Sequence, residues 1–289
     1  MTITPRKRGF FVLAAAHLAA LAVAGVAWLA LAPWNTIPRA AAADGAGMLT
    51  MFCFCFFFKN TSLFDAWWSL APIALVWTWC SVASEVGLDW RALCVCVLVT
   101  LYGVRLTLNW AWTWQGLGHE DWRYIELQEK TGRAWWVVSF FGLHVYPTSI
   151  VFFCCCPAAL AIASGASWTW VTTVAALVTL GGIALETVSD RQLHHFRRVS
   201  ENAGKSIHTG LWRWSRHPNY LGELTFWWGV FLFGASTGEG TPWFVLPVLL
   251  LTLIIRFTSI PMMEQRLLKT RPDYEDYQLE VSTLVPWLP

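Results

Sequence analysis

Long apolar runs constrain this chain more than any other feature of its sequence. Residues 10–32 form the first run, 23 residues without an Asp, Glu, Lys or Arg. A helix needs about 20 such residues to cross a bilayer core, whereas the apolar core of a signal peptide has only about 7–15. We therefore expect a retained transmembrane helix behind the basic triplet Arg6, Lys7 and Arg8.

Further apolar runs along the chain define the fold class. They cover residues 63–84, 91–113, 135–163, 168–188, 219–236 and 241–261, while the run at 48–58 has only 11 residues. Charged residues make up 13% of the chain, compared with about 25% in soluble domains. The sequence predicts an all-α, multi-pass transmembrane helix bundle of about seven spans. Residues 48–58 are expected to form a half-helix or an interfacial piece.

The prolines and glycines of residues 33–47 predict a loop. We expect this loop to separate residues 1–44, an N-terminal transmembrane helix and loop, from residues 45–289, which form one membrane bundle. The basic regions 114–134, 190–218 and the tail share one face if single helices separate the runs. The positive-inside rule makes that face cytoplasmic, and residues 6–8 join it only if 44–58 also crosses.

The cysteines and histidines do not predict a metal site. All eight cysteines lie inside apolar runs, and no Cys-x-x-Cys spacing occurs. Such cysteines act as small apolar filler in packed helices. His194 and His195 are adjacent, so they point to different faces of a helix.

The segment "GLWRWSRHPNYLG" (210–222) is the most polar entry to any apolar run. Pro218 restricts His217 to extended backbone and suits the first turn of a helix. The helix that begins near Asn219 therefore directs free N–H groups and a positive dipole end towards the preceding loop. Arg213 and Arg216 add guanidinium groups, whose shape matches phosphate. The segment predicts a bound anionic ligand.

A basic loop whose side chains snorkel to the membrane surface is the alternative interpretation. It accounts for the arginines but not for Glu223, which lies four residues beyond Asn219 on the same helical face. Ionisable residues inside a membrane helix are usually functional.

Three more clusters carry groups suited to acid–base chemistry. The tail "EQRLLKTRPDYEDY" places Glu264 and Tyr277 after the last run, and Glu264 could pair with Arg213 or Arg216. The loop "QGLGHEDWRY" carries Glu120 and Tyr124, which either act in catalysis or cap the next helix. In "NTSLFDAWW", Asp65 is either a helix cap or a polar wall of a substrate cavity.

These motifs resemble a known family. "HTGLWRWSRHPNYLGE", followed by "EQRLLKTRPDYEDY", resembles the C-terminal region of the steroid 5-alpha-reductase superfamily. The pieces "NTSLFDAWWSLAP", "GVRLTLNWAW" and "GHEDWRY" look like an uncharacterised bacterial and eukaryotic branch of it. The resemblance covers residues 45–289 and is most specific in the last hundred.

The resemblance implies a multi-pass helical enzyme that uses NADPH to reduce an activated carbon–carbon double bond of a lipid, such as a steroid or enone. Cofactor residues of the related sterol double-bond reductases match Arg197, Trp212, Asn219, Tyr220 and Tyr277, and Glu264 matches an acidic position. Met263 and Thr270 depart from that pattern, and the Gln-Glu pair of the steroid reductases is absent. With the polar segment, the predicted cofactor site comprises Arg197, Trp212, Arg213, Arg216, His217, Asn219, Tyr220, Glu223, Glu264 and Tyr277. Asp65, Glu120 and Tyr124 are the candidates for the catalytic acid.

Two other functions stay open. Isoprenylcysteine methyltransferases of the membrane share an Arg-His-Pro-x-Tyr-x-Gly segment and bind S-adenosylmethionine, and a catalytically silent membrane protein is the third alternative. Residues 190–218 carry six Lys or Arg against two acids, which favours the phosphates of NADPH. The expected partners are membrane lipids and a lipid-like substrate, with no nucleic acid. The expected location is the endoplasmic reticulum in a eukaryote or the inner membrane in a bacterium, with the cofactor loops in the cytoplasm.

Overall fold

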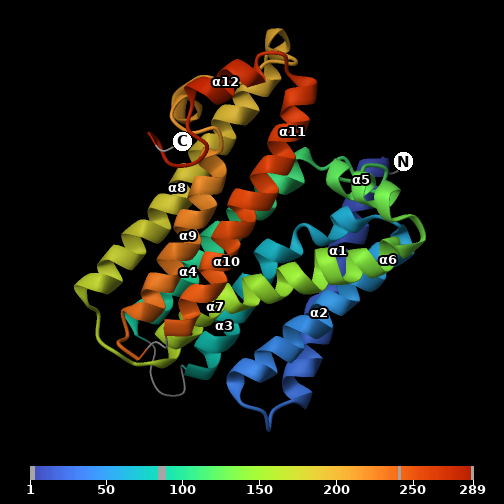
Figure 1. Cartoon of the computed structure of the whole chain (residues 1–289). Coiled ribbons are helices and arrows are strands. Elements are labelled where there is room, and N and C mark those ends of the chain that lie inside the picture. Colours follow the sequence, from blue (N-terminus) through green and yellow to red (C-terminus); the bar gives the residue numbers. More distant parts are fainter. Residues whose placement is uncertain (1–3, 84–88, 240–241, 288–289) are drawn as a thin grey trace.

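The computed structural model describes residues 4–83, 89–239 and 242–287, and within these ranges the regular structure is entirely helical (Figure 1). This confirms the predicted all-α fold class. Residues 84 and 241, at the ends of two predicted spans, lie outside the described residues. The α-helices are α1 (Pro5–Ala30), α2 (Thr36–Phe58), α3 (Trp67–Ala83), α4 (Trp90–Thr113), α5 (Trp122–Thr131), α6 (Trp135–Val138), α7 (Tyr146–Ala163), α8 (Trp170–Arg198), α9 (Pro218–Ala235), α10 (Val245–Ile254), α11 (Ile260–Thr270) and α12 (Tyr274–Glu280).

Seven helical stretches within the described residues are long and apolar enough to cross a membrane. This number agrees with the prediction of about seven spans and is compatible with a multi-pass integral membrane protein. The set differs from the predicted one at two places, because it contains α2 and does not contain α9. The stretches are Pro5–Ala30, Thr36–Phe58, Thr61–Ala83, Trp90–Thr113, Trp122–Ala163, Trp170–Arg198 and Pro242–Thr270.

The predicted loop at 33–47 and the short element at 48–58 are wrong, because both belong largely to helix α2. The run of alanines in its first half favours a helix, and Pro38 falls in the first turn, where it is tolerated. Gly47 lies inside the helix, where it allows close packing, and does not mark a loop. A Cβ atom there would lie 2.6 Å from the Trp67 ring and 3.3 Å from the Ala20 carbonyl oxygen. The predicted boundary after residue 44 thus falls inside α2.

Helix α9 was predicted as an ordinary span but is more polar than the seven, since its first two turns carry Asn219 and Glu223. It runs antiparallel to α8 and contacts it along its length through small residues. A Cβ atom at Gly182 would lie 2.4 Å from the Phe226 backbone nitrogen, and one at Gly229 would lie 2.6 Å from the Thr179 backbone nitrogen. Glycines at such positions let membrane helices approach closely.

Two short π-helical segments interrupt the long helices next to prolines. One covers Ser139–Val145 between α6 and α7, and the other covers Ile255–Ser259 between α10 and α11. Pro147 and Pro261 lie two residues beyond their ends. Because proline lacks an N–H and clashes with the carbonyl group four residues earlier, a wider turn accommodates it. Such segments are frequent at functional sites.

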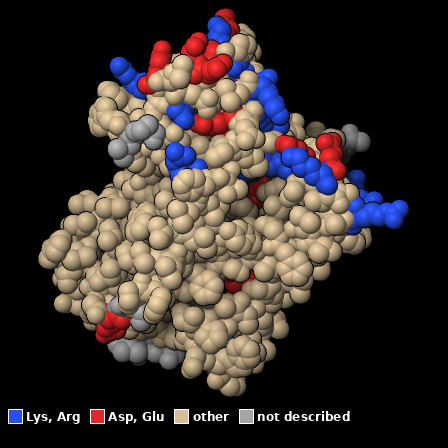
Figure 2. All heavy atoms as spheres, viewed as in Figure 1, with Lys and Arg blue, Asp and Glu red and all other residues tan. Residues whose placement is uncertain are grey.

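The basic side chains gather at one end of the bundle, the upper end in Figure 2. The Arg6 guanidinium donates to the Trp112 carbonyl oxygen at 3.0 Å, so the N-terminus lies beside the loop after α4. At the same end, the Arg266 guanidinium lies 4.2 Å from the Trp122 ring centroid. Helix α2 adds one crossing between the N-terminal basic triplet and the other basic regions. This additional crossing places the triplet at the same end as those regions.

The glycine contacts between α8 and α9 predict a position-specific loss of stability. We expect Gly182→Ala to lower the free energy of unfolding by about 1–3 kcal/mol, since the new methyl group meets backbone atoms that cannot rotate away. Gly181→Ala is the matched control, because a Cβ atom there meets nothing within 4 Å. Thermal unfolding in detergent measures both variants, and equal midpoints would contradict this account of the interface.

Candidate active site

A cavity of about 370 Å³ lies inside the bundle, within the roughly 300–1,000 Å³ of typical small-molecule sites. Most of its wall comes from α4, α7, α8, α9 and α10, and the π-helical segment after α10 contributes Ile255 and Ser259. One part of the wall is apolar, with Leu106, Ile150, Val151, Leu251, Ile254 and Ile255. The other part is polar, with Tyr102, Asn109, Arg123, Glu186, Asp190, Asn219, Tyr220 and Glu223. The cavity can hold an apolar molecule that has one polar end.

Glu223 is the centre of the first polar group. The Tyr102 hydroxyl donates to Glu223 Oε1 at 2.6 Å, and the Trp227 indole N–H donates to the same oxygen at 2.8 Å. The Tyr102 ring stacks on Phe226 with a centroid distance of 3.7 Å. This stacking fixes the hydroxyl of α4 against the carboxylate of α9.

Arg105 is the centre of the second polar group. It pairs with Glu186 and, at 2.7 Å, with Asp190 Oδ2. The Asn109 side-chain amide donates to the same oxygen of Asp190 at 3.0 Å. A charge among apolar helices is costly unless it is paired and hydrogen-bonded. Two carboxylates share one guanidinium here, so this wall of the cavity is acidic.

The first turn of α9 places two predicted residues beside these groups. Asn219 and Tyr220 both line the cavity, as Glu223 does one turn later. The Asn219 side-chain oxygen is buried and has no hydrogen-bond partner among the described residues. Buried polar atoms are nearly always paired, so this oxygen is available to a ligand.

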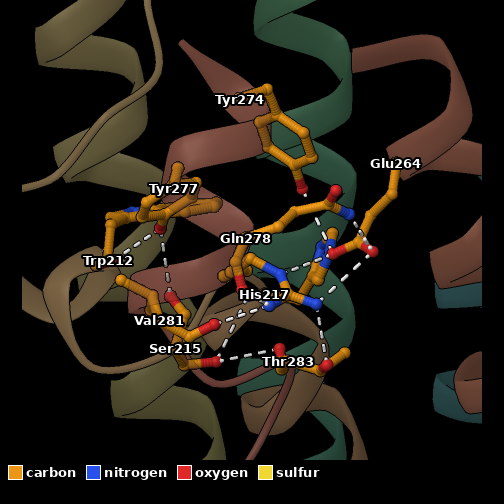
Figure 3. A network of polar contacts seen from close by, with 10 residues as sticks. Trp212, Ser215, His217, Glu264, Tyr274, Tyr277, Gln278, Val281 and Thr283 are labelled. Carbon is orange, nitrogen blue, oxygen red and sulfur yellow. Dashed lines mark hydrogen bonds and ion pairs between the residues drawn. The ribbon is translucent and has the colours of Figure 1, made fainter. Parts of the chain in front are cut away.

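Arg216 and Glu264 form the centre of a separate network, shown in part in Figure 3, which we call the C-terminal clasp. The clasp comprises Arg216, His217, Glu264, Tyr274, Gln278 and Thr283. Its central ion pair joins Arg216 Nε and Glu264 Oε1 at 2.7 Å, so of the two partners that the sequence left open for Glu264, Arg213 and Arg216, the structure has Arg216. Further contacts to Glu264 come from the His217 ring, the Tyr274 hydroxyl and the Gln278 amide.

The guanidinium of Arg216 has no free donor. Nη1 donates to the carbonyl oxygens of Gln278 and Val281, and Nη2 donates to Thr283 Oγ1 and Glu264 Oε2. Together with the Nε bond, all five N–H groups are used within the chain. The geometry therefore gives Arg216 a structural role in holding the C-terminal segment, in place of the predicted contact with a phosphate.

Trp212 and Tyr277 also make internal contacts. The Trp212 indole N–H donates to the Ser189 carbonyl oxygen at 3.1 Å, which holds the 210–213 turn against α8. The Tyr277 hydroxyl donates to the Trp212 carbonyl oxygen. Burial raises the pKa of Tyr277, so this hydroxyl stays protonated. Both side chains shape the loop above α9 and do not line the cavity.

The three predicted catalytic candidates hold the loop after α4 against the start of α3. Asp65 accepts hydrogen bonds from the Tyr124 hydroxyl at 2.6 Å and the Trp110 indole at 3.2 Å. Glu120 accepts one from the Thr61 backbone N–H, and burial raises the pKa of Glu120. None of the three lines the cavity, so the geometry does not support their predicted contact with a substrate.

Arg197 and Arg213, the remaining predicted cofactor residues, are exposed. Within the described residues neither forms a hydrogen bond or an ion pair, although Arg213 lies 5.0 Å from the Trp214 ring centroid. Arg271, in the turn before α12, is likewise unpaired within the described chain and half-buried. Arg197 lies close enough to Arg271 and Asp190 to interact electrostatically with both charges. These side chains retain free donors for an anion.

The cavity contains polar residues that the sequence analysis did not assign to the site, namely Tyr102, Glu186 and Asp190. Helical spacing could have identified them. Tyr102 and Asn109 are seven residues apart on α4, and Glu186 and Asp190 are four apart on α8. Each pair therefore lies on one face of an apolar helix. Predicting that these faces meet requires knowing that α4 packs against α8 and α9.

The clasp predicts that Arg216 affects stability more than ligand binding. Arg216→Lys keeps the charge but has at most three donors, so we expect a loss of about 1.5–3 kcal/mol in the free energy of unfolding. Arg213→Lys, on the exposed side of the same turn, should leave the unfolding midpoint unchanged. Thermal unfolding in detergent compares the two, and equal midpoints would show that the clasp is not a stabilising contact.

Comparison with known proteins places the chain in a family. Residues 51–281 match the family described as Protein of unknown function (DUF1295). An uncharacterized protein of Schizosaccharomyces pombe is 26% identical over 259 residues, which make up 80% of this chain and 74% of that protein. No solved structure matches the chain significantly. The family match covers most of the chain, and the chain therefore belongs to the DUF1295 family, which is of the steroid 5-alpha-reductase type.

Proposed function

We propose that this protein is an integral membrane oxidoreductase that uses NADPH to reduce a carbon–carbon double bond of a lipid-like enone. The observation that supports it is the cavity at the first turns of α9. There Asn219, Tyr220 and Glu223 meet Tyr102 at the polar end of a largely apolar space. The resemblance of the C-terminal motifs to those of the sterol double-bond reductases supports this reaction class.

The residues at the cavity fit a nicotinamide cofactor. The unpaired Asn219 side-chain oxygen can accept a hydrogen bond from a carboxamide. Tyr220 lines the cavity beside it with an aromatic ring. When bound, NADPH would supply a hydride to the β-carbon of a conjugated system.

Tyr102 is our candidate for the group that stabilises the developing enolate oxygen, in place of Asp65, Glu120 and Tyr124. The stacked Phe226 holds its ring at the polar end of the cavity, and its single O–H, which donates to Glu223 in the structure, would turn from that carboxylate to the enolate oxygen. A donor beside the oxygen on which charge develops stabilises that charge in the transition state.

Arg197, Arg213 and Arg271 are the side chains that we assign to the phosphates of the cofactor. They lie in the last turn of α8, in the 210–213 turn and directly after α11, and their guanidinium donors are unpaired within the described residues. This assignment replaces Arg216, whose donors hold the clasp. By the positive-inside rule we assign the basic end of the bundle to the cytoplasm, where NADPH is available.

The methyltransferase of the isoprenylcysteine type is the second candidate. One observation favours it: Glu186 and Asp190 give the cavity an acidic wall with only Arg105 between them. That charge suits the sulfonium cation of S-adenosylmethionine. The unpaired arginines at the basic end favour NADPH, because S-adenosylmethionine carries no phosphate.

Ligand titration separates the two candidates. We expect NADPH to raise the thermal unfolding midpoint of the detergent-purified protein in a concentration-dependent way, since a ligand of the native state stabilises it by mass action. S-adenosylmethionine should leave the midpoint unchanged. Stabilisation by S-adenosylmethionine and none by NADPH would overturn the reductase proposal.

Arg197→Gln tests the phosphate assignment. It should weaken NADPH binding about tenfold or more, because one charge-assisted hydrogen bond contributes about 1.5–3 kcal/mol. The unfolding midpoint without ligand should not change, since Arg197 makes no internal hydrogen bond in the described chain. Glu201→Gln is the control, an exposed residue of the following turn. Unaltered NADPH affinity would exclude Arg197 from the site.

Tyr102→Phe tests the assignment of the enolate donor. The phenyl ring keeps the stack on Phe226, and we expect the turnover of a conjugated enone lipid to fall about 100-fold or more. NADPH binding should be retained, which a midpoint titration checks on the same preparation. Full turnover with the Phe variant would assign the donor elsewhere.

A further inference from the structure

A second hollow lies on the outer surface between α4 and α8, opposite the cavity. Its volume is about 580 Å³, and we call it the α4–α8 groove. Its apolar part is lined by Leu101, Val104, Leu108 and Trp112 of α4, and its basic part by Arg191, His194, His195 and Arg198 of α8. The groove therefore has an apolar part and a cationic part, which complement the apolar chain and the anionic headgroup of an amphiphile.

The basic part of the groove has free donors. Neither Arg191 nor Arg198 makes a side-chain hydrogen bond or an ion pair within the described chain, and the Arg198 guanidinium lies 5.4 Å from the centroid of the Trp112 ring. Asp190 is the acidic residue among the lining side chains, and it is already bound by Arg105 and Asn109. The charge that a ligand meets is therefore positive.

The apolar part is exposed on the surface of α4. Leu101 is 50% exposed, Leu108 is 63% exposed and Trp112 is 68% exposed. They lie on one helical face, with Trp112 nearest the basic end and Leu101 deepest in the span. This order matches a lipid that stands in one leaflet, with its headgroup at the basic end and its chain along α4.

We propose that the α4–α8 groove binds one membrane phospholipid with an anionic headgroup. Arg191 and Arg198 contact the phosphate, and the acyl chain covers Leu101, Val104 and Leu108. Basic pockets between transmembrane helices are suited to anionic headgroups. Asn109 and Asp190 line both the groove and the cavity, so the lipid packs against the outer side of the cavity's acidic wall. The proposal does not depend on NADPH or on any reaction.

A lipid titration without cofactor tests this site. The unfolding midpoint of the delipidated protein in detergent is followed with phosphatidylglycerol, phosphatidylcholine, glycerol phosphate and inorganic phosphate. Phosphatidylglycerol should raise the midpoint, and the other three should not. In Arg191→Gln/Arg198→Gln, the apparent affinity should fall about 25-fold, since each basic side chain near an anionic headgroup contributes about fivefold.

Three further variants distinguish binding in the groove from non-specific attraction between the lipid and the positive charges. Leu108→Trp fills the apolar part and keeps every charge, so it should abolish the effect of phosphatidylglycerol. Leu18→Trp, at a similarly exposed position of α1, should keep it, as should Arg133→Gln/Lys205→Gln at exposed positions outside the groove.

Equal stabilisation by phosphatidylcholine, or an unchanged response in Leu108→Trp or in the Arg191/Arg198 variant, would overturn the proposal. Equal stabilisation by the soluble phosphates would overturn it too, since it would show an anion site without a lipid. None of these readouts contains NADPH, so failure here and failure of the proposed function are distinguishable.

Discussion

The close contact between α8 and α9 is the constraint on which the rest of the site depends. Gly182, Gly222 and Gly229 bring the two backbones together, and a Cβ atom at Gly222 would lie 2.6 Å from the backbone nitrogen of Glu186. The same contact sets two acidic residues, Glu186 and Glu223, on neighbouring walls of one cavity. Side chains larger than hydrogen would separate the helices and displace both carboxylates. The positions of the polar groups in the cavity therefore depend on glycines, which have no side chain of their own.

Arginine plays three different roles in this bundle, and its surroundings decide which. Arg105 is half-buried, pairs with the carboxylates of Glu186 and Asp190, and lines the α4–α8 groove. Arg216 uses all its donors to fasten the C-terminal segment. Arg197 keeps its donors free at the basic end of the bundle. A guanidinium group binds an external anion only where the chain has not already supplied acceptors. We therefore base the phosphate assignment on free donors and not on proximity in the sequence.

The sequence predicted some parts of the site and not others for identifiable reasons. The first turns of α9 were predicted to bind a ligand, and Asn219, Tyr220 and Glu223 line the cavity. The acid was sought in the most polar loops, but those loops use their carboxylates to hold α3 and the loop after α4 together. No polar motif marks Tyr102 in the sequence, because it lies inside the apolar run 91–113. Its hydroxyl becomes informative only beside Glu223.

By itself, the sequence determined the all-helical, membrane-compatible class, because charge-free runs of this length leave few other folds. Its motifs also predicted the steroid 5-alpha-reductase type, and the family match over residues 51–281 agrees with that type. It misjudged α2, since glycine and proline signal loops locally but also permit close packing and first-turn positions. The tertiary structure alone decided which polar residues share a cavity and which arginines remain free. The sharing of the cavity and the pairing of the arginines depend on contacts between helices that are distant in sequence. A local sequence pattern does not indicate which faces of those helices meet.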